Sequence, residues 1–232
     1  MNKENILFGI VGLLGGLIIG FMFANSMNRN MAAAPAASPS TMAQNANMPP
    51  GHPDIGSQTQ TVPPNVQHEI DQARKSPQDF DAQIRAADSL YKAEMYEKAL
   101  EFLLAANKIK PDHYETIVSL GNASFDSGKF EDAEKWYTTA LGRKKDDANV
   151  RTDLGLTFIF REKPDYERAI QEFNVVLTAD PNHIQALQNS IVAYLRKGDS
   201  SKAKENLARL EGADPKNNAI PRLREQINKA GA

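Results

Sequence analysis

The chain has 232 residues, enough for one or two domains, and a formal net charge of −2. This small charge provides no basic field for nucleic acid and no acidic tail for a basic partner. The absence of cysteine excludes disulfides, thiolate metal sites, cysteine nucleophiles and a lipid anchor attached through cysteine. Methionine and proline are concentrated before residue 65 and nearly all charge lies after residue 68, which divides the chain into residues 1–24, 25–65 and 66–232.

Residues 1–24 contain an apolar run, from Ile6 to Ala24, with no charged or amide side chain. As a helix this run would be about 28 Å long, close to the ~30 Å hydrocarbon core of a bilayer. Because the run is longer than the apolar core of a secretory signal, we expect an uncleaved transmembrane anchor. The N-terminal amine and Lys3 favour a cytoplasmic N-terminus. We therefore expect a single-pass protein of a bacterial inner membrane with a periplasmic C-terminal domain.

Three glycines in this run, Gly12, Gly16 and Gly20, are spaced by four residues and share one face of the expected helix. Such a smooth face lets a second helix approach closely in lipid, which would support self-association or packing against a partner helix. The alternative is that glycine is simply common in membrane helices, where its cost is tolerated.

We interpret residues 25–65 as a disordered tether. They carry only two charges, Arg29 and Asp54, and are rich in proline, alanine and serine, so they have little to bury. The motif from Met48 to His52 contains possible ligands for copper or haem iron. One histidine in an unstructured segment makes a poor site, so a short docking motif and an inert linker both remain open. We predict no cofactor and no metal site.

The third segment, residues 66–232, repeats with a period of 34 residues. Prolines mark the ends of units at Pro77, Pro111, Pro181 and Pro215. At the end of one further unit, Lys145 takes the place of the proline. Three further columns recur: small residues at Ala99, Ala133, Ala169 and Ala203; bulky residues at Leu103, Tyr137, Phe173 and Leu207; and Ala106, Ala140, Val176 and Leu210. The third unit has a turn two residues longer than the others. The pattern predicts two amphipathic helices per unit, stacked into one continuous core.

These columns, together with Leu120-Gly121 and Leu154-Gly155, resemble those of the tetratricopeptide repeat family. The resemblance implies an all-α fold, a right-handed α-solenoid of about four helix pairs with a capping helix. The repeats would cover residues 80–111, 114–145, 148–181 and 184–215. Residues 66–76 would form a partial repeat, and residues 219–229 the cap.

No sequence motif points to catalysis. The phosphate-binding loop, the H-E-x-x-H zinc motif and the G-x-S-x-G nucleophile elbow are all absent from the sequence. His113 and His183 occupy the same slot after the repeat proline, so we interpret them as turn residues too far apart to share a metal. We expect the protein not to be an enzyme.

The family resemblance implies a concave groove that binds a peptide or protein. Carried onto this sequence, the groove positions of the first helices are Ile84, Asp88, Tyr91, Lys92, Val118, Asn122, Phe125, Asp126, Thr152, Leu156, Ile159, Phe160, Gln188, Val192, Leu195 and Arg196. Some of these residues could instead pack against neighbouring helices. Val118 stands where chaperone-tail binders have a lysine, which argues against that partner.

Three functional hypotheses follow. The first is a membrane-anchored scaffold that holds a protein partner near the bilayer, as in secretion, envelope assembly or cytochrome c maturation. The second is a structural assembly factor whose glycine-rich helix drives oligomerisation or joins a membrane complex. A third, minor one is an organelle import receptor with its repeats in the cytosol.

Overall fold

The computed structural model describes residues 61–230, which form ten α-helices and no strand. The predicted all-α fold is confirmed for this part of the chain. The apolar run with Gly12, Gly16 and Gly20, the Met48–His52 motif and the linker up to residue 60 lie outside the described residues. None of the helices within residues 61–230 is both long and apolar enough to cross a membrane.

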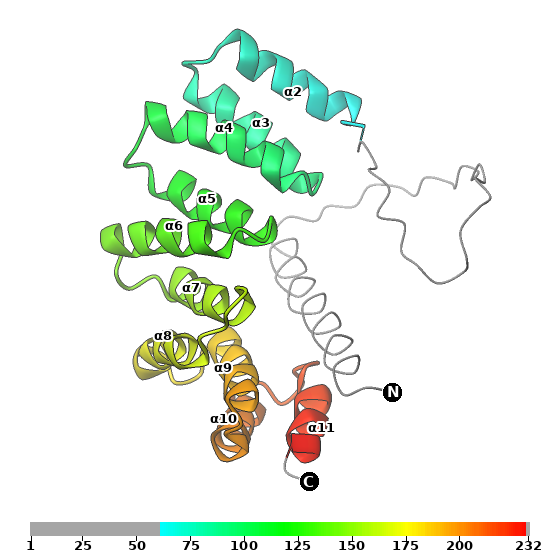
Figure 1. The fold of residues 1–232 in the computed structure, drawn as a ribbon, viewed down its shortest axis with the longest axis vertical. Helices are drawn as coiled ribbons and strands as arrows, with labels where there is room; N and C mark the ends of the chain where they lie inside the picture. The colour runs from blue at the N-terminus through cyan, green and yellow to red at the C-terminus, as the bar shows by residue number, and fades with distance from the viewer. Residues whose placement is uncertain (1–60, 231–232) are drawn as a thin grey trace, which may run out of the picture. The chain divides into compact units, whose positions relative to one another are not determined.

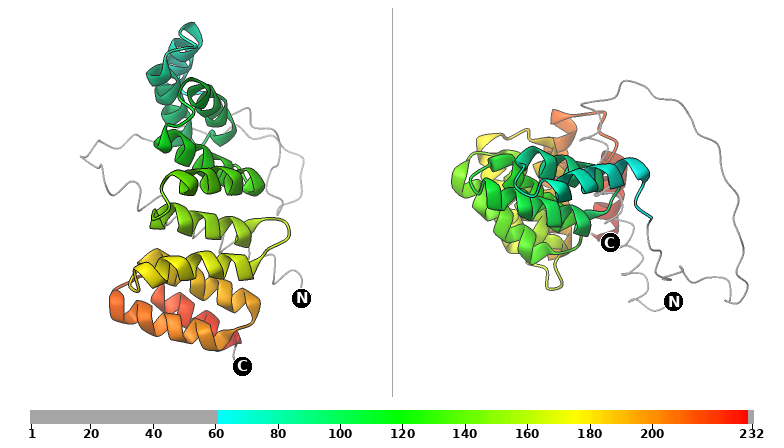
Figure 2. Two further views of the ribbon diagram at one scale, coloured as in Figure 1. Left: turned by 90° about the vertical axis from the view of Figure 1, so that its left-hand side faces the viewer. Right: turned by 90° about the horizontal axis from the view of Figure 1, so that it is seen from above.

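The helices follow one another as connected pairs (Figure 1). Their bounds are α2 Pro64–Lys75, α3 Phe80–Lys92, α4 Tyr96–Ile109, α5 Tyr114–Asp126, α6 Phe130–Arg143, α7 Ala148–Phe160, α8 Tyr166–Ala179, α9 Ile184–Lys197, α10 Ser200–Ala213 and α11 Ile220–Ala230. The first helices of the four pairs are α3, α5, α7 and α9, and the second helices are α4, α6, α8 and α10. Each second helix contacts the first helix of the next pair, so the pairs stack in chain order (Figure 2).

Polar side chains fix the start of each first helix. The carboxylates of Asp79 and Asp147 accept hydrogen bonds from backbone N–H groups in the first turns of α3 and α7. In α5 and α9 the Nδ1 atoms of His113 and His183 accept from backbone N–H groups at 3.3 and 3.2 Å. Each cap satisfies donors that the helix itself leaves unpaired. The two histidines are therefore helix caps, which agrees with their interpretation as turn residues.

The turns inside the pairs are of two kinds. Glu94, Gly128 and Gly198 have φ values of 58°, 75° and 88°, so one left-handed residue reverses the chain in the first, second and fourth pairs. The connection between α7 and α8 is longer, and Arg161 ends α7 in an extended conformation instead. The two additional residues in the third unit therefore lie entirely in this connection.

Within the second and third pairs, a glycine permits close helix crossing. A Cβ atom placed on Gly121 would lie 2.5 Å from the Cε1 atom of Tyr137, and one on Gly155 would clash with the Phe173 ring. Both rings are almost fully buried. Because each ring fills the space that the missing Cβ leaves, the small residue and the bulky residue of the repeat form one packing unit.

The stack begins with α2, a second helix without a first helix of its own in the described residues. It packs Val66, Ile70 and Ala73 against the first pair. The buried Gln83 donates hydrogen bonds to the carbonyl oxygens of Ala73 (2.9 Å) and Ser76 (3.4 Å), which ties the end of α2 to α3.

The stack ends with α11, which takes the place of a fifth first helix. It contacts α10 and α9, as α9 contacts α8 and α7. Ile220, Leu223 and Ile227 are buried in the C-terminal part of the core. Where a first helix would face its own second helix, α11 has the exposed polar residues Glu225 and Asn228. Such a polar side is what a terminal capping helix requires.

Candidate functional site

The predicted partner-binding residues lie on the first helices in three states of exposure. We call the side of the stack that carries these residues the first-helix face. Asp88 and Lys92 are exposed. Partly buried are Ile84, Tyr91, Val118, Asn122, Asp126, Phe160, Leu195 and Arg196. Buried are Phe125, Thr152, Leu156, Ile159, Gln188 and Val192.

Three of the buried positions correct the expectation that their side chains are accessible to a partner. Leu156 has no exposed surface and belongs to the core. Phe125, 5% exposed, is packed against two other phenylalanines. Gln188 donates a 2.7 Å hydrogen bond to the Oδ1 atom of Asn217, because the connection leading into α11 folds back onto α9. The expected face is therefore partly covered by the chain itself, most clearly in the fourth repeat.

An aromatic cluster joins the second and third repeats. The ring of Phe125 makes edge contacts with Phe130 and Phe160 at centroid distances of 5.3 and 5.8 Å, and Phe130 stacks on Phe160 at 6.2 Å. Phe130 and Phe160 remain partly exposed. The cluster thus offers an apolar surface at the edge of the first-helix face where α5, α6 and α7 meet.

A polar cluster lies where the first three repeats meet. The Tyr91 hydroxyl donates a hydrogen bond to the carboxylate of Asp126, and the Tyr137 hydroxyl donates to the Oδ1 atom of Asn122 at 2.9 Å. The first bond joins the first helices α3 and α5, and the second joins α6 to α5 within the second pair. No ion pair to Asp126 or Asp153 occurs within residues 61–230.

The electrostatics of this cluster disfavour negative charge. Burial raises the pKa of Asp126, although the hydrogen bond from Tyr91 partly offsets the rise. Burial, together with the negative charges of Asp126 and Asp147, raises the pKa of Asp153 to about 7. Near neutral pH the carboxyl group of Asp153 is therefore partly protonated and partly ionised. Asp153 was not among the predicted site residues, because its position in the repeat does not belong to the usual groove set.

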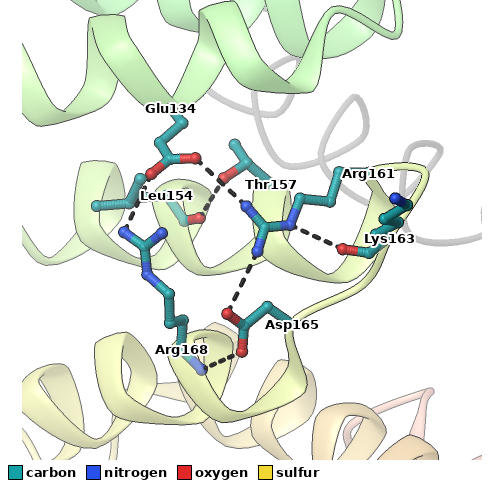
Figure 3. Close-up of polar contacts among 7 residues, drawn as sticks. All are labelled: Glu134, Leu154, Thr157, Arg161, Lys163, Asp165 and Arg168. Atoms are coloured by element: carbon teal, nitrogen blue, oxygen red, sulfur yellow. Dashed lines mark hydrogen bonds and ion pairs between the residues drawn. The ribbon is translucent and has the colours of Figure 1, made fainter.

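Ion pairs hold the long connection between α7 and α8 (Figure 3). Arg161 pairs with Glu134 of α6 at 3.5 Å and with Asp165 at 3.3 Å, and its Nε atom donates to the carbonyl oxygen of Lys163 at 3.0 Å. Arg168 of α8 also pairs with Glu134, at 3.0 Å. Asp165 in turn accepts a hydrogen bond from the backbone N–H of Arg168 and caps α8. These contacts tie the inserted residues to the second repeat.

The described residues show no group suited to metal binding: no three histidine, aspartate or glutamate side chains are gathered for that purpose within residues 61–230. The face combines aromatic, aliphatic and charged side chains spread over several helices. Such a surface can bind an extended or helical polypeptide segment by covering its side chains.

The tetratricopeptide repeat family matches the chain over residues 90–154 and 161–227. Tetratricopeptide repeat protein 12 of Mus musculus is 29% identical over 115 residues, which are 50% of this chain but only 16% of that protein. The chain therefore spans a small part of that relative's length.

Solved structures with the same fold include MamA, residues 41 to the end, from Desulfovibrio magneticus RS-1. It is 18% identical, with a TM-score of 0.59 over 66% of this chain and 85% of that chain. YrrB, described as a TPR protein with an unusual peptide-binding site, is 19% identical, with a TM-score of 0.60 over 69% of this chain and 81% of that one. At these identities the likeness shows the fold alone.

Proposed function

Because this chain belongs to the tetratricopeptide repeat family, we propose that it is a scaffold that holds a polypeptide partner on its first-helix face. The observation that carries this proposal is the row of partly exposed apolar side chains on successive first helices: Ile84, Val118, Phe160 and Leu195. A bound segment that covered these side chains would remove apolar surface from water. Catalysis has no part in the proposal.

The aromatic cluster gives the partner a natural anchor point. Phe130 and Phe160 are already positioned by their contacts with Phe125. A partner side chain that packs on them would need little rearrangement of the scaffold, and rigid aromatic side chains are frequent centres of binding energy.

We further propose that residues 6–24 anchor the scaffold in a bacterial inner membrane, with the repeats on the periplasmic side. Support comes from the length and apolarity of the run and from its polar flanks. An anchor would hold the partner near the bilayer and raise its effective concentration there. Such an arrangement suits secretion, envelope assembly or cytochrome c maturation. Fractionation of cells, followed by protease treatment of spheroplasts, tests the anchor and the orientation separately.

Site-specific photocrosslinking in the native membrane tests the proposed face. A photoreactive residue at Val118 or Phe160 should capture a protein partner. The matched control positions are Leu104 and Val175, large apolar side chains on the second helices α4 and α8 that are 42% and 51% exposed. If exposed apolar surface alone caused crosslinking, the two control positions would capture more protein than Val118 and Phe160 do. Crosslinks from the control positions alone would refute the proposed face.

A further inference from the structure

Two carboxyl groups on neighbouring first helices lack a compensating positive charge. Asp126 is the last residue of α5, and Asp153 lies in the first half of α7. The two groups are close enough for their charges to interact, because the negative charge of Asp126 adds to the rise in the pKa of Asp153. Asp126 accepts a hydrogen bond from Tyr91, whereas the carboxyl group of Asp153 has neither a hydrogen bond nor an ion pair within residues 61–230.

Asp153 is deeply buried and yet not sealed from solvent. Desolvation is the largest cause of its raised pKa, so protein atoms surround its carboxyl group on most sides. The residue nevertheless keeps some exposed surface. A ligand can therefore contact this carboxyl group from the first-helix face. Because buried charged groups are normally paired, an unpaired one that remains accessible indicates a ligand of opposite charge.

Basic side chains on the surrounding helices act on other partners. Arg151 of α7 pairs with Glu172 of α8 at 2.7 Å. Lys92 of α3 acts on Asp88, where its charge partly offsets the effect of burial on the pKa. The last turns of α5 and α7 contain no basic residue. Both charges that act on Asp153 are negative, so residues 61–230 supply no cation to it.

Aromatic rings and a helix end beside Asp126 also favour a positive charge. The rings of Tyr91 and Tyr96 meet edge to face at a centroid distance of 5.2 Å. Burial, followed by the charge of Asp126, raises the pKa of both hydroxyl groups, which therefore stay neutral. Tyrosine rings attract cations, and the C-terminal end of α5 carries a partial negative charge. Carboxyl groups, rings and helix end thus share a preference for a cationic ligand.

We propose that Asp126 and Asp153 form a cation-binding site that receives the ammonium group of a lysine side chain from the bound polypeptide. The two carboxyl groups come from different helices, and an ammonium group can donate hydrogen bonds in several directions. The planar guanidinium of arginine is better suited to one carboxylate in a bidentate arrangement. The assignment of the ammonium group to a polypeptide rests on the proposed function. The site itself does not depend on it.

Titration of the full-length chain in neutral detergent, labelled with ¹³C-aspartate, tests the site without any knowledge of the partner. Methylammonium chloride replaces sodium chloride at constant ionic strength and at pH 8, above the pKa of about 7 of Asp153. The carboxyl ¹³C signals of Asp126 and Asp153 should both shift and saturate. Asp153→Asn, followed at Asp126, and Asp126→Asn, followed at Asp153, should each weaken binding at least about tenfold, because a charge-assisted hydrogen bond is lost.

The matched control is Asp146→Asn, which removes the same charge from an exposed aspartate between α6 and α7. This variant should bind methylammonium as the wild type does. Equal weakening by Asp146→Asn would mean that a diffuse negative field attracts the cation, and it would overturn the proposed site.

Other contrary outcomes of the titration are equally decisive. Absence of a methylammonium-specific shift would refute the cation site, while crosslinking from Val118 could still succeed. Tetramethylammonium that binds as tightly as methylammonium would show that no N–H donor is recognised, which excludes lysine. N-acetyl-lysine amide should bind more tightly than N-acetyl-arginine amide and glycinamide. If either of the other two binds as tightly or more tightly, arginine or a free N-terminus replaces lysine and the assignment fails.

Discussion

Gly121 lies so close to Tyr137 that a Cβ atom on the glycine would come within 2.5 Å of the ring's Cε1 atom. Gly121→Ala should therefore lower the free energy of unfolding by about 1–3 kcal/mol, the usual cost of overpacking a core. Gly155→Ala should do the same against Phe173. Gly142→Ala is the control, since nothing lies within 4 Å of its added Cβ and alanine favours a helix. Urea denaturation measures all three, and equal stabilities would contradict the packing unit.

Asp153 should make the protein less stable as the pH rises. Its pKa is about 7 in the folded chain, above the ~3.9 of an unfolded aspartate, so the folded state binds more protons between these values. Stability is therefore highest below about pH 4 as far as this group is concerned, and it decreases until about pH 7. Asp153→Asn should be more stable than the wild type at pH 8, and the difference should shrink toward pH 4.

The control for this titration is Asp146→Asn, an exposed aspartate in the connection between α6 and α7. Thermal melts of both variants across the pH range provide the comparison. If Asp153→Asn and the wild type lose stability in parallel from pH 4 to pH 8, the carboxyl group of Asp153 is not the group responsible.

Glu134 and Arg161 should be energetically coupled. Their side chains are only 26% and 21% exposed, and the pair joins α6 to the long connection of the third repeat. A double-mutant cycle with Glu134→Gln and Arg161→Gln should give a coupling energy of about 1 kcal/mol, at the upper end for pairs near a surface. Lys163→Gln is the control, because Arg161 uses only the backbone carbonyl of Lys163. Additive effects of the two substitutions would mean that the pair contributes nothing.

The cap of α9 should accept aspartate in place of histidine. His183→Ala removes the acceptor for the backbone N–H of Ala186 and should cost about 1 kcal/mol. His183→Asp should restore or exceed the wild-type stability, since Asp79 and Asp147 cap α3 and α7 in the same way. Circular dichroism melts report both. An aspartate variant no more stable than the alanine variant would rule out capping as the role of this position.

The helix pairs could be predicted because the same kind of contact between two helices recurs in successive units. Gly121 with Tyr137, and Gly155 with Phe173, recur at one spacing, and a spacing can be recognised without coordinates. Helix starts could be read in the same way, although two histidine caps were interpreted only as turn residues. Local chemistry that recurs is what a sequence shows most directly.

The accessible part of the first-helix face was harder to predict, because accessibility depends on what packs above a residue. Leu156 and Val118 both belong to the usual groove set, yet only Val118 keeps exposed surface. Gln188 bonds to Asn217 in the connection to α11, which lies beyond the four repeats that the sequence predicts. The raised pKa of Asp153 arises first from burial and then from the negative charges of Asp126 and Asp147, so the spacing of residues along α7 alone does not predict it.

The main helix contacts in residues 62–230 join elements that are neighbours or next neighbours along the chain. Folding of this stack therefore needs no encounter between distant segments, and the entropy lost on closing long loops stays small. Any one pair can serve as a nucleus from which order spreads in both directions. The first repeats can accordingly acquire their shape on the ribosome while the later ones are still being synthesised.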